Sequence, residues 1–375
     1  MPGLKDKIIL FCKRETVFVA AATVAVLSAL LVHPSEEYFT YPDYRVLALL
    51  FCLMVIVAGI REQGIFVLLG EKMTGKAKSF RQLSMLLVML CFFSSMLITN
   101  DVALLTFVPF SMEILCMSGC SEKMIRVIVL QTIAANLGSM FTPVGNPQNL
   151  YLFGLTGMSL PEFLLFMVPL AALSFLLLAV IIFFDQKQML RQTYRESDIR
   201  PDKKRVIVLV ILFLLSLLTV VRILPWQIML IIVTAGILFI DRRLFAKVDY
   251  FLLGTFLFFF IFVGNMQRMD AVRDLLENLL RGREMLFSVL ASQIISNVPA
   301  AMLLSGFTEN YRALIYGVNI GGLGTLIASL ASLISYKLYA ASERADKGRY
   351  IAVFTGYNVL FLGILLLAGF LCCRL

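Results

Sequence analysis

Long apolar segments, separated by short charged ones, run along almost the whole chain. Segments such as Leu160–Phe184, Val206–Val221 and Tyr350–Cys373 are long enough to cross about 30 Å of hydrocarbon as helices. The pattern predicts nine membrane-crossing helices, of which the third and the eighth are broken: Val17–Val32, Val46–Ile60, Met124–Phe153, Leu160–Phe184, Val206–Ile223, Trp226–Ile240, Phe251–Gly264, Tyr311–Leu338 and Tyr350–Cys373.

Two further apolar segments, Leu83–Cys116 and Met285–Phe307, are each interrupted by a polar triplet. The first triplet, Thr99–Asp101, lies in "ITNDVALLTFVPF", and the second, Ser296–Val298, lies in "ISNVPAAMLLSGF". In hydrocarbon a chain can unwind only inside protein or beside water, because unpaired backbone groups are costly there. We interpret both segments as re-entrant hairpins, which enter and leave the membrane on the same side.

The two triplets belong to a larger internal repeat. "NLGSMFTPVGNPQN" (136–149) aligns with "NIGGLGTLIASLAS" (319–332), and "DYRVLALLFCLMVIVAG" (43–59) aligns with "DYFLLGTFLFFFIFVGN" (249–265). Three matches in the same order indicate a duplicated unit. Because five crossings separate the copies, an odd number, the two copies would be inverted relative to each other.

We therefore predict an all-α polytopic membrane protein with two inverted-topology repeats. Residues 1–184 form the first repeat with its hairpin at 83–116, residues 185–205 form a cytoplasmic linker, and residues 206–375 form the second repeat with its hairpin at 285–307. Inverted repeats with broken helices in matching positions are typical of secondary transporters, whose site lies near the membrane midplane.

Composition and charge fit this topology. The chain is 60% hydrophobic and 15% charged, whereas soluble domains average about 25% charged residues. The predicted inner segments hold 25 of the 33 Lys and Arg residues, as expected for the cytoplasmic membrane if the N-terminus lies inside and the C-terminus outside. The net charge of +9 then reflects topology, and we expect no nucleic-acid partner. The first apolar run lacks a following small-residue cleavage site, which favours a helix over a signal peptide.

Each predicted break exposes the carbonyl end of one half-helix and the amide end of the next. Carbonyl ends suit a cation and amide ends suit an anion. Since the predicted core contains no Lys or Arg, Asn100, Asn297 and Thr325 are candidate donors to an anionic substrate. Oxygens of Thr99, Asn100, Ser296 and Asn297 are candidate ligands of Na⁺. The alternative is that the triplets are only helix N-caps, a common role of these residue types.

Asp101 is the asymmetric element of the repeat, because its counterpart is Val298. An intramembrane carboxylate is costly and by default a functional hypothesis. Asp101 is interpreted as a cation ligand or a proton carrier, with a plain N-cap as the alternative. Arg61 and Glu62, at the end of the second helix, are expected to pair at the membrane surface. The substrate-binding candidates are Asn100, Asp101, Thr142, Asn146, Asn149, Asn297 and Thr325.

These motifs resemble the ion-transporter superfamily of arsenite-efflux permeases, sodium–proton antiporters and divalent-anion:sodium symporters with a citrate-transporter-like domain. The resemblance covers most of the chain. In the dicarboxylate branch both tips read Ser-Asn-Thr, whereas here they read Thr-Asn-Asp and Ser-Asn-Val, and the Asn-Asp pair looks more like the arsenite-permease branch. The resemblance implies two cation sites, one at Thr99, Asn100 and Gly145 and one at Ser296, Asn297 and Thr325.

The expected function is a secondary active transporter of a small anion or oxyanion-like solute, coupled to Na⁺ or H⁺ and needing no cofactor. The alternative within transport is a sodium–proton antiporter that uses Asp101. An intramembrane enzyme is disfavoured, because the chain has a single histidine, His33, and neither a GxSxG nor an HExxH motif. The expected partners are the solute, the lipid bilayer and, as relatives of this architecture often dimerise, a second copy of the chain.

Overall fold

The protein is helical almost throughout. In the described part of the chain, extended backbone pairs only at an isolated bridge between Ser79 and Met189. The predicted fold class, an all-α polytopic membrane protein, is confirmed. The structure is a computed structural model that describes residues 15–75, 77–185, 187–190, 199–342 and 345–374.

The unbroken predicted crossings are single helices that begin and end within a few residues of the predicted bounds. Asp43 caps the second of them by accepting a hydrogen bond from the Val46 N–H at 3.0 Å, and Asp249 caps its repeat counterpart from the Leu252 N–H at 2.9 Å. The aligned Asp-Tyr pairs thus begin helices in the same way. The helices are α2 (Thr16–Leu31), α3 (Tyr44–Glu62), α9 (Leu160–Phe183), α10 (Lys203–Val220), α11 (Trp226–Asp241), α12 (Tyr250–Gln267) and α18 (Lys347–Arg374).

The two predicted broken helices are indeed broken. Residues 140–146 separate α7 (Met124–Ser139) from α8 (Pro147–Thr156), and residues 322–329 separate α16 (Tyr311–Gly321) from α17 (Leu330–Ala340). In each copy a helix therefore stops inside the protein and resumes after a short unwound loop.

The two predicted hairpins are helical pairs joined by a single residue. The first consists of α5 (Phe80–Ile98) and α6 (Asn100–Met117), and the second of α14 (Glu284–Ile295) and α15 (Asn297–Ser305). The first hairpin is longer than predicted, and its helices are long and apolar enough to cross a membrane, as are α3, α9, α12 and α18. The number of crossings and their orientation stay predictions.

Two helices were not predicted from the sequence. α4 (Ile65–Thr74) and α13 (Asp270–Leu280) follow α3 and α12 directly, so they occupy matching places in the two copies. α13 is strongly amphipathic, and its Leu275 is exposed. A helix with one apolar face and one charged face suits the membrane–water interface. Because these segments are short and contain charged residues, they were assigned to loops in the prediction.

The predicted linker, 185–205, is fixed to the first hairpin at its start. Asp185 is buried and forms an ion pair with Arg126 of α7. The Phe80 N–H donates to the Gln188 carbonyl at 2.8 Å. The linker is therefore anchored where it leaves α9, and its residues 186 and 191–198 lie outside the described residues.

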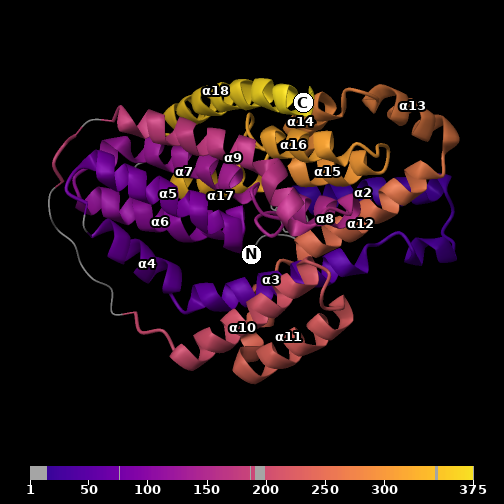
Figure 1. Ribbon diagram of the computed structural model, residues 1–375, viewed down its shortest axis with the longest axis horizontal. Coiled ribbons are helices and arrows are strands. Elements are labelled where there is room, and N and C mark those ends of the chain that lie inside the picture. The colour runs from indigo at the N-terminus through magenta and orange to yellow at the C-terminus, as the bar shows by residue number, and fades with distance from the viewer. Residues whose placement is uncertain (1–14, 76, 186, 191–198, 343–344, 375) are drawn as a thin grey trace, which may run out of the picture.

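The helices pack in matching groups (Figure 1). α2 lies along α12, while α10 and α11 lie against α3, together with the short helix η3 (Arg242–Lys247). The two hairpins pack on the broken helices, α5 and α6 on α7, and α14 and α15 on α16. This arrangement brings the unwound loops and the hairpin tips to the middle of the molecule. Two further short helices are η1 (Glu36–Phe39) and η2 (Ser121–Lys123).

Candidate functional site

The hairpin tips have the same unusual backbone geometry. Thr99 has φ 70° and ψ 151°, and Ser296 has φ 73° and ψ 154°. Residues other than glycine rarely adopt this region, at a cost of about 1–3 kcal/mol. Such strain persists only where the surroundings enforce it, and it is concentrated at functional sites. Its presence at both aligned positions supports the alignment of the two triplets.

Each tip is bonded to the unwound loop of its own copy. The Asn100 N–H donates to the Gly145 carbonyl at 3.2 Å, and the Asn297 N–H donates to the Ala328 carbonyl at 2.9 Å. Neither the Thr99 nor the Ser296 hydroxyl accepts a hydrogen bond from the helix that follows it. The hydroxyls are therefore not N-caps, and the alternative of simple capping fails for these two side chains.

Buried polar side chains join the unwound loops of the two copies. Asn136 and its counterpart Asn319 each contact both copies: Asn136 donates to Ser332 at 3.2 Å, and Asn319 donates to Asn149 at 2.6 Å. Asn100 also donates to Asn136, at 3.0 Å. Because hydrogen-bonded polar groups in a buried network rigidify their surroundings, this network fixes the loops relative to each other. The remaining contacts are Ser329 to Asn136 at 3.0 Å and Asn146 to Asn319 at 3.1 Å.

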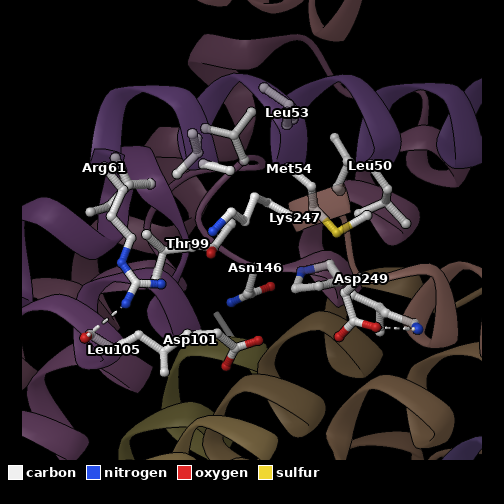
Figure 2. Close-up of a pocket in the computed structure, with 18 of the residues that line it drawn as sticks. Leu50, Leu53, Met54, Arg61, Thr99, Asp101, Leu105, Asn146, Lys247 and Asp249 are labelled. Carbon is white, nitrogen blue, oxygen red and sulfur yellow. Dashed lines mark hydrogen bonds between the residues drawn. The ribbon is translucent and has the colours of Figure 1, made fainter. Parts of the chain in front are cut away.

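A cavity of about 490 Å³ ends at the first hairpin tip. It is lined by α3, by the tip itself, by the start of α8 and by the segment that leads into α12. Figure 2 shows Arg61 and Lys247 pointing into the cavity, with Asp101 and Asp249 across from them and Asn146 between. The volume is in the range of small-molecule sites.

The charged groups of the cavity have different partners. Lys247 pairs with Glu62 at 3.2 Å, and Asp249 caps α12. The Arg61 guanidinium donates to the Leu105 carbonyl at 3.2 Å. Asp101 is left with one buried carboxylate oxygen, Oδ1, that has no hydrogen-bond partner among the described residues.

The space between the two tips is almost closed. A gap of about 10 Å³ separates them, lined by Asn100 and Asp101 from the first tip and by Asn297 and Val298 from the second. Such a volume is about that needed for one water molecule. Asp101 lines both this gap and the larger cavity, so it stands at the boundary between them.

The predicted substrate-binding residues do not all face these spaces. Asn100, Asp101, Asn146 and Asn297 line the cavity or the gap. Thr142 and Thr325 do not. The Thr142 hydroxyl donates to the Met96 carbonyl at 2.5 Å, and the Thr325 hydroxyl donates at 3.3 Å to the carbonyl of Gln293, which aligns with Met96. Asn149 is buried and donates to the carbonyls of Met140 and Thr142. The Thr142 and Thr325 hydroxyls hold the unwound loops against their own copies, whereas Asn149 also accepts from Asn319 and so joins the two copies.

The predicted cation ligands form two groups, one in each copy, and the contacts of the two groups differ. Thr99 lines the cavity, and Asn100 and Gly145 are hydrogen-bonded to each other through the backbone. In the second copy Ser296 and Asn297 contact Ala328, whereas Thr325 contacts Gln293. A carbonyl oxygen has two lone pairs, so that of Gly145 can accept a second interaction, whereas that of Ala328 already accepts from the Asn297 N–H and the Ser296 hydroxyl. Oxygen donors of this kind suit a hard cation.

Four charged residues of the cavity were not predicted as site residues. Arg61 and Glu62 were expected to pair with each other at the membrane surface, but Glu62 pairs with Lys247 and Arg61 faces the cavity. Lys247 and Asp249 come from the other half of the chain. The repeated Asp-Tyr pair was the one signal that pointed to Asp249, since it aligned that segment with the start of α3.

These features define a class of protein: a multi-pass helical membrane protein in which paired hairpin tips meet broken helices beside a solute-sized cavity. This is the organisation of a secondary transporter. The chain belongs to the citrate transporter family, because the family model described as "Citrate transporter" matches residues 8–310.

Several similar proteins are transporters or membrane proteins by name. An uncharacterized transporter of Methanocaldococcus jannaschii is 34% identical over 340 residues, 90% of this chain and 92% of the relative. Inner membrane protein YbiR of Escherichia coli is 33% identical over 306 residues, 79% of this chain and 80% of the relative. Silicon efflux transporter LSI3 of Oryza sativa is 28% identical over 135 residues, 36% of this chain and 27% of the relative. The protein is thus a multi-pass membrane transporter.

Proposed function

We propose that this transporter moves a small anion or oxyanion-like solute across the cytoplasmic membrane by alternating access. The observation that carries the proposal is the cavity of about 490 Å³ that ends at Asp101, beside a gap of only about 10 Å³ between the tips. A route that is open on one side of the site and sealed beyond it is what one end state of alternating access requires. The family name and the silicon efflux relative support a small oxygen-rich solute.

The open side of the cavity corresponds to the cytoplasm. Arg61, Glu62 and Lys247 line it, and all three stand in segments that the distribution of Lys and Arg predicts to be inside. In this orientation the solute enters the cavity from the cytoplasm and leaves it when the tips move relative to α3 and α12.

Coupling to H⁺ or Na⁺ supplies the energy for transport. Asp101 is the residue best placed for this role, because it lines the cavity and the gap and has an unpartnered carboxylate oxygen. A buried carboxylate without a partner is costly when ionised. Protonation removes this cost, and so does a cation bound at Thr99, Asn100 and Gly145.

The direct test is counterflow in proteoliposomes that contain the purified protein. Saturable exchange of labelled citrate or phosphate, accelerated by an imposed pH or Na⁺ gradient, is the expected result. Replacing Na⁺ by K⁺ at constant pH identifies the coupling ion. Leak-like flux that does not saturate would indicate a channel and contradict the proposal.

Asp101→Asn is expected to lower gradient-driven uptake at least tenfold, because the amide cannot carry a proton and has no charge for a cation. Counterflow without a gradient should persist. Asp249→Asn is the matched control, since it removes a carboxylate from the same cavity while asparagine still caps α12. Equal losses in the two variants would remove Asp101 from the coupling step.

A second candidate function is cation–proton antiport at Asp101 without an organic or oxyanion solute. It is favoured by the same unpartnered oxygen of Asp101. Na⁺-driven alkalinisation of proteoliposomes in the absence of any transported anion, abolished by Asp101→Asn, would support it over anion transport.

A further inference from the structure

Arg61 is a basic residue on the wall of the transport cavity that no part of the sequence analysis assigned to the site. We propose that Arg61 binds the anionic group of the solute, either a carboxylate or an inorganic oxyanion. The inference rests on the proposed function and deepens it, because it names both the residue and the chemical class that it recognises.

The Arg61 guanidinium has more N–H donors than its contact with the protein uses. A guanidinium carries five N–H donors in a planar fork that matches two oxygens of a carboxylate or oxyanion. The contact of Arg61 with the Leu105 carbonyl uses one of its terminal nitrogens, NH2. Arg61 is exposed and lines the cavity, and Figure 2 shows its guanidinium turned toward that space. Lysine would supply the charge at this position but not the fork.

The carboxylates around Arg61 do not neutralise it. Glu62 is paired with Lys247, and Asp249 accepts a hydrogen bond at the start of α12. Within the described part of the chain, Arg61 forms no ion pair. The positive charge of Arg61 is therefore available to a solute, and among the described carboxylates that line the cavity Asp101 alone has a buried oxygen without a partner.

The second copy shows that the structural contact of Arg61 does not need a charge. When the two Asp-Tyr pairs are aligned, the counterpart of Arg61 is Gln267. The Gln267 side-chain amide donates to the Gly306 carbonyl at the end of the second hairpin, at 2.7 Å. A neutral amide thus makes a similar contact between helix and hairpin, four residues beyond the counterpart of Leu105. The first copy therefore differs from the second by a positive charge at this position, and that charge lies beside the cavity.

The charges of Arg61 and Asp101 together set the condition for loading. An anion on Arg61 would lie in the same cavity as the Asp101 carboxylate, which would repel it. A proton or a cation at Asp101 removes that repulsion. Binding of the anion at Arg61 and of the coupling ion at Asp101 should therefore favour each other.

The test compares Arg61→Gln, Arg61→Lys and Arg45→Gln with the unmodified protein. Arg45 is the matched control, because it also lies on α3 and also donates to backbone carbonyls, those of Thr219 and Val220, but does not line the cavity. Arg61→Gln should keep the fold, as Gln267, the counterpart of Arg61, makes a similar contact with its hairpin. The readout is the shift of the unfolding temperature of the purified protein with citrate, inorganic phosphate or uncharged silicic acid.

Citrate or phosphate should raise the unfolding temperature of the unmodified protein and of Arg45→Gln. In Arg61→Gln the apparent affinity should fall roughly ten- to a hundredfold, the loss expected for a charge-assisted hydrogen bond, and Arg61→Lys should lie between. Stabilisation by citrate alone assigns a carboxylate, and stabilisation by phosphate alone assigns an inorganic oxyanion. Unchanged affinity in Arg61→Gln, an equal loss in Arg45→Gln, or stabilisation by silicic acid but by neither anion would overturn the inference.

Counterflow separates this inference from the proposed function. Saturable counterflow with the same KM in the unmodified protein and in Arg61→Gln would leave the transport proposal standing and remove Arg61 from the binding site. Absence of saturable counterflow in the unmodified protein, together with anion binding that depends on Arg61, would contradict the transport proposal and leave Arg61 as an anion-binding residue.

Discussion

The two copies of the repeat build the same parts but leave different spaces around them. At the end of α3, Ala58 and Arg61 of the first copy and Lys247 of the second line a cavity. At the aligned place, the end of α12, Tyr41 of the first copy packs directly on Gly264 of the second: a Cβ added to Gly264 would lie 2.6 Å from the Tyr41 ring. Lys247 thus borders a cavity, whereas the ring of its aligned counterpart, Tyr41, fills the equivalent space.

The contacts around Tyr41 close that side further. The Arg268 guanidinium contacts the Tyr41 hydroxyl at 3.4 Å and pairs with Glu37 at 2.9 Å. The counterpart of the Arg268–Tyr41 contact is the Glu62–Lys247 pair. The cavity beside Lys247 reaches the first tip, whereas Tyr41 fills the aligned place, and the cavity of about 610 Å³ lined by Gln267 and Gly306 reaches no residue of the second tip. For inverted repeats, this difference is what distinguishes the two sides of an alternating-access transporter.

The largest difference that we expect between the copies is in the effect of substitutions in the unwound loops on stability and transport. A Cβ at Gly145 would lie 2.1 Å from the Ser139 carbonyl oxygen, a backbone atom that cannot move away cheaply. Gly145→Ala should therefore destabilise the protein by about 3 kcal/mol and abolish counterflow, because the carbonyl that holds the first tip is displaced. The measurement is the unfolding temperature in detergent, with counterflow in proteoliposomes.

Ala328→Gly is the control for this variant, since Ala328 is the aligned residue and already carries a Cβ. It should cost only about 1 kcal/mol, the usual penalty of backbone freedom. Equal stability of Gly145→Ala and the unmodified protein would show that the first loop tolerates the same side chain as the second.

The packed side of the molecule gives the next prediction. Tyr41→Ala removes the ring from Gly264 and the hydroxyl from Arg268, and should shift the equilibrium toward opening of that side by about 1 kcal/mol, roughly fivefold. The measurement is the rate at which a membrane-impermeant maleimide labels Val298→Cys from outside the cell, in a background whose native cysteines are replaced by serine.

Tyr44→Ala is the control, because Tyr44 is exposed and its hydroxyl contacts only the nearby Phe39 carbonyl. Labelling should stay unchanged in it. If Tyr41→Ala also leaves the rate unchanged, Tyr41 does not close the route, and the packed side is held by other contacts.

Much of the fold could be predicted from the sequence, because it rests on local patterns. Apolar length predicted the long helices, the polar triplets predicted the hairpins, and the aligned segments 136–149 and 319–332 predicted the breaks between α7 and α8 and between α16 and α17. The short helices α4 and α13 were missed, α13 because its charged residues resemble a loop and α4 because its 10 residues are too few for a crossing. Their apolar residues at helical spacing were the signal that could have revealed them.

The candidate site was predicted less well, for a physical reason. The repeat shows which residues correspond but not which way they face: Thr142 and Thr325 match each other and hold loops, while Asp101 matches Val298 and faces a cavity. Arg61 and Lys247 are far apart in the sequence and come from different copies. Only the packing of η3 against α3 brings them together.

The tips themselves should show the smallest difference between the copies. Thr99→Gly and Ser296→Gly both relieve the positive φ, and the gain is partly cancelled by the greater freedom of glycine in the unfolded chain. Each variant should therefore change the free energy of unfolding by no more than about 1 kcal/mol, with the same sign.

Transport should separate the two tip variants even though stability does not. Thr99 lines the cavity, so Thr99→Gly should raise KM for the solute or lower its dependence on the coupling ion. The Ser296 hydroxyl contacts the Ala328 carbonyl at 3.4 Å and lines neither the cavity nor the gap, so Ser296→Gly should leave both quantities nearly unchanged. A larger transport defect in Ser296→Gly would place the solute or its coupling ion at the second tip. The cavity beside the first tip would then be only the entrance, because the unequal spaces would no longer mark where the solute is held.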